Sequence, residues 1–306
     1  MNRTQFNKSV VPGLFSLAMD SYEKKAKEAI WKKYVTVKGS KRAYEQSAYY
    51  GGIGMPVLKP EGEAITYDDM VQGPTKTWTH RTYGVGTRIS EELIEDSLYP
   101  DVPTTMESQT REIGDAFAEL WEVLVHDIFN NGTNTNNHTA GDTLAVFSAS
   151  HTNLRLGTYS NLLSPASDLS ATSLQTAIDQ FTTTKDDSGK FQIIKPRYII
   201  VHPNNAWKTY ELLESGYDPE SPNNSINSIR KWGLSPIVSP YYTDTDAFTL
   251  FAEPPHADGG IIVFMRRKPT FAQDGDFETG DFKFKGTARF SVEVNKPNNI
   301  FHSAGA

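Results

Sequence analysis

Segment 281–294 constrains the fold more than any other part of the chain, because its side chains alternate almost without interruption. One side of the segment carries Phe282, Phe284, Ala288, Phe290, Val292 and Val294, and the other carries mostly charged and hydroxyl side chains. Successive side chains of a strand point to opposite faces, so the pattern predicts a strand with one buried and one solvated face. At about 3.3 Å per residue, such a strand is roughly 46 Å long, which exceeds the usual length.

A helix of similar length is predicted over 104–130. Thr104 and Glu107 form a capping-box pattern at its start, and Asn131-Gly132 is a typical stop signal. At 1.5 Å per residue the helix extends for roughly 40 Å. Since helix and strand match in length, we expect the helix to lie along the sheet in one elongated α+β layer. Gly114, inside this helix, is interpreted either as a bend point or as a close packing contact.

Residues 55–88 predict an extended β-ribbon that cannot form a core of its own. The run 75–83 is rich in Thr, Trp and Tyr but poor in aliphatic side chains, and Gly and Pro precede it. A two-stranded ribbon of this kind is only marginally stable alone in water. We therefore expect the ribbon to project from the body and to rest on another surface.

Two further regions have recognisable patterns. Residues 14–34 predict an amphipathic helix with many lysines on its polar face, and its apolar stripe could pack on the chain's own core or on a neighbour. A compact α/β unit follows later, with a helix over about 170–184, a strand over 197–202 and a helix opened by Pro203. Short strands near 234–239 and 247–252 complete that unit.

Composition removes several classes of function. The chain has 30 Lys and Arg against 37 Asp and Glu, so its net charge is −7, which argues against a protein that binds nucleic acid by neutralising phosphates. It has no cysteine, which excludes disulfides, thiolate metal sites and thiol catalysis. No run of 18 to 20 apolar residues and no signal-peptide pattern is present, so we expect a soluble protein made in a cytoplasm.

Motifs for catalysis are also absent from the sequence. It has no phosphate-binding loop, no nucleophile elbow and no His-Glu-x-x-His pair. His126, His138 and His151 could converge on a metal ion, which leaves a metal-assisted α/β hydrolase as one alternative. Isolated histidines are more often solvated or singly hydrogen-bonded, and the acidic group 274–281 is interpreted as a hairpin tip rather than a calcium loop. We therefore assign no catalytic, metal-binding or cofactor-binding residue.

The order of these elements resembles a known architecture. A basic amphipathic N-terminal helix, a projecting β-ribbon, a long helix, an α/β unit and long closing strands follow one another along the chain. This order is similar to that of the major capsid proteins of tailed bacteriophages, whose Hong Kong ninety-seven-type shell fold is shared with encapsulins. The stretches that carry the likeness are 61–69, 75–80, 83–86, 88–92, 195–203, 286–290 and 300–303.

The resemblance implies how the chain is divided and what it does. The implied parts are an N-terminal arm (1–50), an E-loop ribbon (51–90), a peripheral domain (91–159) with a spine helix (104–130), an axial domain (160–258), and closing peripheral strands with a C-terminal tail (259–306). The implied function is a structural capsid protein, not an enzyme, that forms hexamers and pentamers of an icosahedral shell around phage double-stranded DNA. Maturation would proceed by subunit rotation, and the protein would reside in the virion. An encapsulin-like cargo shell is the alternative with the same fold.

The resemblance also implies partners. The main partner is the protein itself, followed by a portal and possible decoration proteins, with only non-specific proximity to packaged DNA. About 50 residues precede the ribbon, so we expect a separate scaffolding protein. We take as candidates for contacts between subunits Leu14, Tyr22, Ile30, Trp31, Tyr67, Lys76, Trp78, His80, Arg81 and Tyr83.

Overall fold

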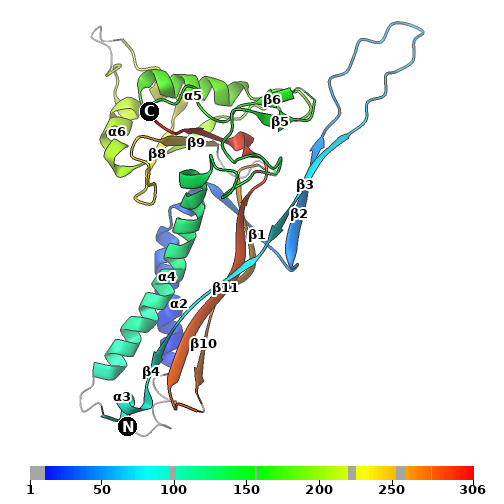
Figure 1. Ribbon diagram of the computed structural model, residues 1–306. Helices are drawn as coiled ribbons and strands as arrows, with labels where there is room; N and C mark the ends of the chain where they lie inside the picture. Colours follow the sequence, from blue (N-terminus) through cyan, green and yellow to red (C-terminus); the bar gives the residue numbers. More distant parts are fainter. Residues whose placement is uncertain (1–10, 97–100, 156, 220–224, 253–258, 277) are drawn as a thin grey trace.

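The computed structural model describes residues 11–96, 101–155, 157–219, 225–252, 259–276 and 278–306. An elongated body of helices and long strands carries a compact α/β unit at one end, and a thin finger projects sideways near their junction (Figure 1). None of the described helices is long and apolar enough to cross a bilayer.

A four-stranded sheet forms one layer of the elongated body. Its strand order is β1 (Val35–Gly39), β10 (Ile261–Gly275), β11 (Phe282–Val294) and β4 (Arg81–Ile89). β1 runs parallel to β10, and the other two pairs are antiparallel. Phe284, Ala288 and Phe290 are buried on one face of β11, which confirms the alternation seen in the sequence. Between β10 and β11, Asp276 N–H donates to the Asp281 carbonyl and Gly280 N–H donates to the Asp276 carbonyl, as expected for a hairpin tip.

The second layer is the long helix α4 (Asp101–Asn131), which lies along the sheet (Figure 1). It begins three residues earlier than the capping-box pattern predicts. Pro103 falls in the first turn, where its missing N–H costs no hydrogen bond. Trp121 stacks on Phe290 with ring centroids 3.6 Å apart, and this contact joins the middle of the helix to the sheet.

The N-terminal helix α2 (Val11–Glu28) packs on its own chain. Leu14 and Ala18 are buried in the main core, and Ser21 Oγ donates a 2.5 Å hydrogen bond to Asp115 on α4. A Cβ atom added to Gly114 would overlap the carbonyl oxygen of Ala18, so Gly114 lets the two helices approach closely. Gly114 is therefore a close packing contact. The apolar stripe of the N-terminal helix packs on the chain's own core. The helix also ends earlier than predicted, followed by a short 3-10 turn η1 (Trp31–Lys33).

The α/β unit, which we call the axial unit, contains the second four-stranded sheet. Its strand order is β12 (Ile300–Ser303), β9 (Phe248–Ala252), β7 (Pro196–Val201) and β8 (Ser235–Val238). Helices α5 (Ala171–Thr183) and α6 (Ala206–Glu214) lie in the segments where the sequence predicts helices. The unit also contains three short 3-10 turns, η2 (Pro203–Asn205), η3 (Ile229–Trp232) and η4 (Pro297–Asn299). Ile199 and Val201 belong to the helix-covered core, whereas Ile200 between them belongs to the core shared with α4.

The last strand of the chain returns to the axial unit. From sequence, 300–303 was grouped with the closing strands of the peripheral region, but β12 pairs with β9 instead. The reason is visible in its side chains, because Phe301 is buried in the same core as Leu174 of α5. A small hairpin of β5 (His151–Asn153) and β6 (Gly157–Tyr159) lies at the end of the axial unit nearest the finger (Figure 1).

The ribbon differs from the prediction over 55–88. β2 (Tyr44–Gly51) pairs with β3 (Val71–Thr79), and residues 52–70 between them form no strand. β4 (Arg81–Ile89) leaves the ribbon and pairs with β11 at the edge of the long sheet. The predicted ribbon was wrong in its pairing because β4 pairs with the edge of β11. This contact joins segments far apart in the chain, so local sequence does not encode it. The short helix α3 (Glu91–Asp96) follows β4.

Candidate assembly surface

Residues 52–70, which we call the finger, expose apolar side chains that the chain does not cover. Met55, Val57, Ile65 and Met70 are exposed, and Leu58 and Tyr67 are each 91% exposed. Exposed apolar clusters of this kind mark interaction sites in folded proteins. The finger projects from the body without lying against another element over most of its length (Figure 1). It therefore has the properties of a segment that a second molecule completes.

The base of the finger is held by Arg155, which lies in the turn after β5. Its guanidinium donates a 3.1 Å hydrogen bond to the Asp68 carboxylate and a 2.7 Å hydrogen bond to the Asp69 carbonyl. The Gly54 N–H donates to the same carboxylate at 2.7 Å, so both sides of the finger meet at Asp68. These bonds lower the pKa of Asp68. Arg155 thus sets the direction in which the finger leaves the body.

Below the finger, the strands β2 and β3 are anchored by three side chains of β3 and its end. Lys76 Nζ donates to the carbonyl and to the hydroxyl of Thr139. Trp78 is buried and stacks on Phe264 with ring centroids 5.8 Å apart. His80 is buried between Ser40 and Ser291, with nitrogen-to-oxygen distances of 3.0 and 3.2 Å. The root of the finger is therefore part of the body's own fold.

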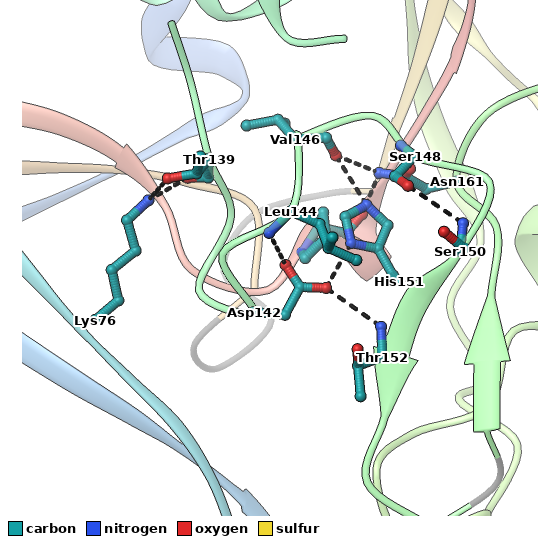
Figure 2. Close-up of polar contacts among 11 residues, drawn as sticks. Lys76, Thr139, Asp142, Leu144, Val146, Ser148, Ser150, His151, Thr152 and Asn161 are labelled. Atoms are coloured by element: carbon teal, nitrogen blue, oxygen red, sulfur yellow. Dashed lines mark hydrogen bonds and ion pairs between the residues drawn. The ribbon is translucent and has the colours of Figure 1, made fainter. Parts of the chain in front are cut away.

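Figure 2 shows that Thr139, the partner of Lys76, begins a loop built around a buried pair, Asp142 and His151. His151 Nδ1 lies 2.8 Å from Asp142 Oδ2, and both side chains are almost fully buried. The backbone N–H groups of Leu144 and Thr152 also donate to the Asp142 carboxylate. Burial alone would raise the pKa of Asp142, but the hydrogen bond and charge of His151 outweigh it and lower that pKa.

The surroundings of His151 give this pair a structural character. Its Nε2 atom faces the Val146 carbonyl oxygen at 3.2 Å and its Nδ1 atom faces Asp142, so both ring nitrogens are engaged by oxygen atoms of the chain's own fold. A hydrolytic triad would place a hydroxyl nucleophile at Nε2 instead. The Val146 carbonyl also accepts from Asn161 Nδ2 at 2.8 Å, and this bond completes the loop (Figure 2). The pair therefore fixes the loop that receives Lys76.

The three histidines of the hydrolase alternative have separate partners. His138 lies 2.7 Å from Asp127, and His151 lies against Asp142. His126 Nε2 lies 2.8 Å from the Ser239 hydroxyl, and burial lowers the pKa of His126 to about 4. Among the described residues, no group of three or more His, Cys, Asp or Glu side chains is arranged to hold a metal ion.

The structure separates the predicted contact residues into two groups. Leu14, Trp31, Trp78 and His80 are buried within the single chain. In the single chain these four side chains are covered by their own fold. Tyr22, Ile30, Lys76 and Tyr83 are half-buried, whereas Arg81 and above all Tyr67 are exposed. Arg81 and Tyr67 thus have the most accessible surface in the single chain.

Sequence reasoning missed Arg155, Thr139 and the Asp142–His151 pair. Each is brought to the finger by contacts between segments far apart in the chain. Asp68 and Arg155 are 87 residues apart, and Lys76 and Thr139 are 63 apart. No local pattern in the sequence marks these contacts.

Comparison with known proteins places this architecture. Residues 74–302 match the family described as phage capsid protein. The chain belongs to this family. A comparison with curated protein sequences gives no match.

Solved structures show the same fold as this capsid protein. The capsid of cyanophage P-SCSP1u matches with a TM-score of 0.59 and 13% identity, covering 91% of this chain and 88% of that chain. A virus-like particle from Pyrococcus furiosus matches with a TM-score of 0.54 and 12% identity, covering 95% and 98%. The SrpI encapsulin of Synechococcus elongatus matches with a TM-score of 0.50 and 9% identity, covering 87% and 83%. The expectation of a phage capsid shell fold is therefore confirmed.

Proposed function

We propose that copies of this capsid protein assemble, as hexamers and pentamers, into an icosahedral phage head that encloses double-stranded DNA. The observation that carries the proposal is the finger, whose apolar side chains project from an otherwise well-packed body. Leu58 and Tyr67 lie in water in the single chain. Burying such side chains removes apolar area from water, at about 25 cal/mol per Å². A neighbouring copy that receives the finger would provide that burial.

The mechanism is repeated packing rather than catalysis. In this proposal, the finger of one copy lies over the peripheral body of the next, while Arg155 and the Lys76–Thr139 contact hold its base in one direction. Each contact is modest, but many copies joined in a closed shell dissociate slowly because all contacts must break together. A rigid root combined with an exposed tip suits this role.

Charge and shape support the remaining parts of the proposal. A net charge of −7 suits an inner wall that does not adhere to phosphates, since screened repulsion keeps DNA mobile beside it. Maturation would proceed by rotation of whole subunits. A portal, decoration proteins and a separate scaffolding protein are the further partners we propose, and the virion is the proposed location.

A cargo shell of the encapsulin type is the second candidate, favoured by the fold alone. It would use the same finger and the same ring contacts, and it differs only in its contents. The family match to phage capsid proteins is the reason for preferring the phage head.

The test is to express the chain alone and to examine it by sedimentation and electron microscopy. We expect oligomers, closed particles or irregular shells, because the finger needs a neighbour. A clean monomer of 34.1 kDa at micromolar concentration would contradict the proposal. Particles purified from infected cells decide the contents, since nuclease-protected DNA supports the phage head and protein cargo supports the second candidate.

A further inference from the structure

One end of the axial unit carries an aromatic surface that the chain leaves uncovered. Helix α6 buries Thr209, Leu212 and Leu213 against the unit. Trp207 and Tyr210, three positions apart and so on one helix face, point outward, and the Trp207 side chain is 85% exposed. Trp and Tyr are the side chains most enriched among residues that dominate binding energy at protein interfaces.

Neighbouring segments extend this surface. Tyr217 and Ile226 are joined by an isolated β-bridge just after α6, and both are exposed. We call Trp207, Tyr210, Tyr217 and Ile226 the aromatic edge. Four large apolar side chains gathered at one end of a small unit form a patch that folding of the single chain does not explain.

The opposite end of the axial unit has an open pocket of about 580 Å³. Its lining comes from β6 and from the C-terminal end of α5, and includes Tyr159, Leu162, Gln180, Thr183 and Lys185. This volume lies within the range of protein sites that bury a drug-sized group. The pocket combines aliphatic and aromatic surface with hydroxyl and amide groups, which suits a side chain that is apolar but carries one N–H donor.

Exposed apolar side chains also lie beside this pocket. Phe191 pairs with Lys185 of the lining through a β-bridge, and its ring lies 4.9 Å from Lys185 Nζ. Ile193 follows two residues later and is almost fully exposed. We call the pocket together with Phe191 and Ile193 the pocket edge. Both ends of the axial unit are thus apolar and uncovered, but their shapes differ, one protruding and one hollow.

The two edges lie at opposite ends of one rigid unit. α6 is at one end of it, and β5 and β6 are at the other, beside the finger (Figure 1). The pocket edge is continuous with the root of the finger, because the backbone at Gly51 packs against Asp187, next to the lining residue Lys185. A copy that received the finger would therefore also lie next to the pocket edge.

We propose that axial units join head to tail, with the Trp207 side chain of one copy inserted into the pocket edge of the next. Different surfaces meet in such a contact, so each copy can both give and receive a tryptophan, and a suitable rotation closes a ring. The indole N–H would donate to a side-chain oxygen of Gln180 or Thr183, and the ring would lie against Leu162. This inference rests on the proposed shell function and names the surfaces by which its rings close.

The absence of cysteine allows a direct test by paired substitutions. The double variant Trp207→Cys with Thr183→Cys is assembled at a protein concentration well above the raised threshold expected when Trp207 is replaced, and its particles are treated with a short thiol-specific cross-linker. We expect a ladder of covalent oligomers that ends in closed rings, because every copy carries both halves of the contact. The matched control pairs Trp207→Cys with Thr172→Cys, an exposed position at the other end of α5 and about 16 Å away along the helix. We expect that control to remain monomeric in denaturing gels.

Each alternative outcome has a distinct meaning. If particles of the double variants form but the Thr183 pair gives no ladder, or the Thr172 pair gives the stronger one, the head-to-tail contact is overturned while the shell function stands. Cross-linked dimers from Trp207→Cys alone would show a symmetric contact and would also overturn it. If wild-type chains form no particles at all, the proposed function fails first.

A second measurement follows assembly directly. Trp207→Ala should raise the protein concentration needed for particle formation at least about tenfold. Trp207→Phe should bring that concentration most of the way back to the wild-type value. Since Trp207 is exposed in the single chain, thermal unfolding of the dissociated monomer should not change. An unchanged assembly concentration in Trp207→Ala would contradict the proposal.

Discussion

The finger and the long sheet differ in how their side chains are covered, although both are long and thin. In the sheet, Phe284 and Phe290 of β11 are covered by α2 and α4 of the same chain, and Trp121 stacks directly on Phe290. In the finger, Leu58 and Tyr67 have no cover from their own chain. An extended segment is stable when other elements pack along it. The long sheet has such elements in its own chain, whereas the exposed side chains of the finger do not.

The boundary between the two regions is sharp. Trp78 and His80, at the root, are buried, whereas Asp68, ten residues before Trp78, is partly exposed and is held by Arg155 and the Gly54 backbone. Substitutions in the body should therefore change folding, and substitutions in the finger should change assembly. The predictions below test that division, from the largest expected effect to the smallest.

The largest effect is expected where the long helix meets the sheet. Trp121→Ala removes a fully buried ring that stacks on Phe290 and on Trp31. We expect a loss of about 4 kcal/mol in the free energy of unfolding, because a cavity remains in a tightly packed core. Chemical denaturation of the dissociated monomer measures it. A loss below about 1 kcal/mol would mean that the body is not packed as described.

A smaller effect is expected at the contact between α2 and α4. Gly114→Ala places a methyl group against the Ala18 carbonyl, which belongs to the backbone and cannot rotate away. We expect a destabilisation of about 2 kcal/mol as the helices separate. If Gly114 served as a bend point instead, the same substitution would stabilise the helix interior, since Ala is the better helix former.

The pH dependence of stability probes the sheet near the root of the finger. Burial raises the pKa of Glu293 to about 7, although Lys76 and Arg81 act to lower it. Because the folded-state pKa exceeds the ordinary value of 4.5, Glu293 does not lower the free energy of unfolding below pH 4.5. It lowers the stability progressively as the pH rises from 4.5 to about 7.

Glu293→Gln removes that cost. We expect the variant to be more stable than the wild type by about 2 kcal/mol at pH 8 and equally stable at pH 4. Denaturation curves at the two pH values measure the difference. Equal stability of the two proteins at pH 8 would show that the Glu293 carboxylate is well solvated.

The smallest effect on folding is expected at the base of the finger. Arg155→Ala should change the unfolding free energy by less than about 1 kcal/mol, because the ion pair with Asp68 is partly exposed. A glutamate-specific protease should nevertheless cut after the exposed Glu61 several times faster, since the direction of the finger is no longer fixed. Arg197→Ala, which removes an exposed arginine on β7, is the matched control and should leave this rate unchanged. Equal cleavage rates in the two variants would show that Arg155 does not fix the direction of the finger.

Sequence alone predicted the elements that have a strong local period. The alternation of 281–294 predicts β11 to within one residue, and the start and stop signals of 104–130 predict α4 to within three. The axial unit followed in the same way from its strand at 197–202. These segments are buried along one face by their own chain, so the spacing of their apolar residues indicates that face directly.

What the sequence could not give are the pairings between distant segments. β4 joins β11, β12 returns to β9, and Arg155 reaches Asp68, and each depends on the folded chain rather than on local pattern. The same limit applied to Leu14 and Trp31, because an apolar stripe shows that a surface is covered but not by which molecule.

Deleting the tip of the finger tests the central claim most directly. Residues 55–67 are replaced by a short Gly-Ser linker, and Leu58→Ser with Tyr67→Ser serves as a full-length companion variant. Unfolding of the monomer and particle formation are then measured on the same preparations. We expect an unchanged unfolding midpoint and no closed particles from the deletion, with weakened assembly in the companion. A large fall in the unfolding midpoint, or normal particles from the deleted chain, would contradict it.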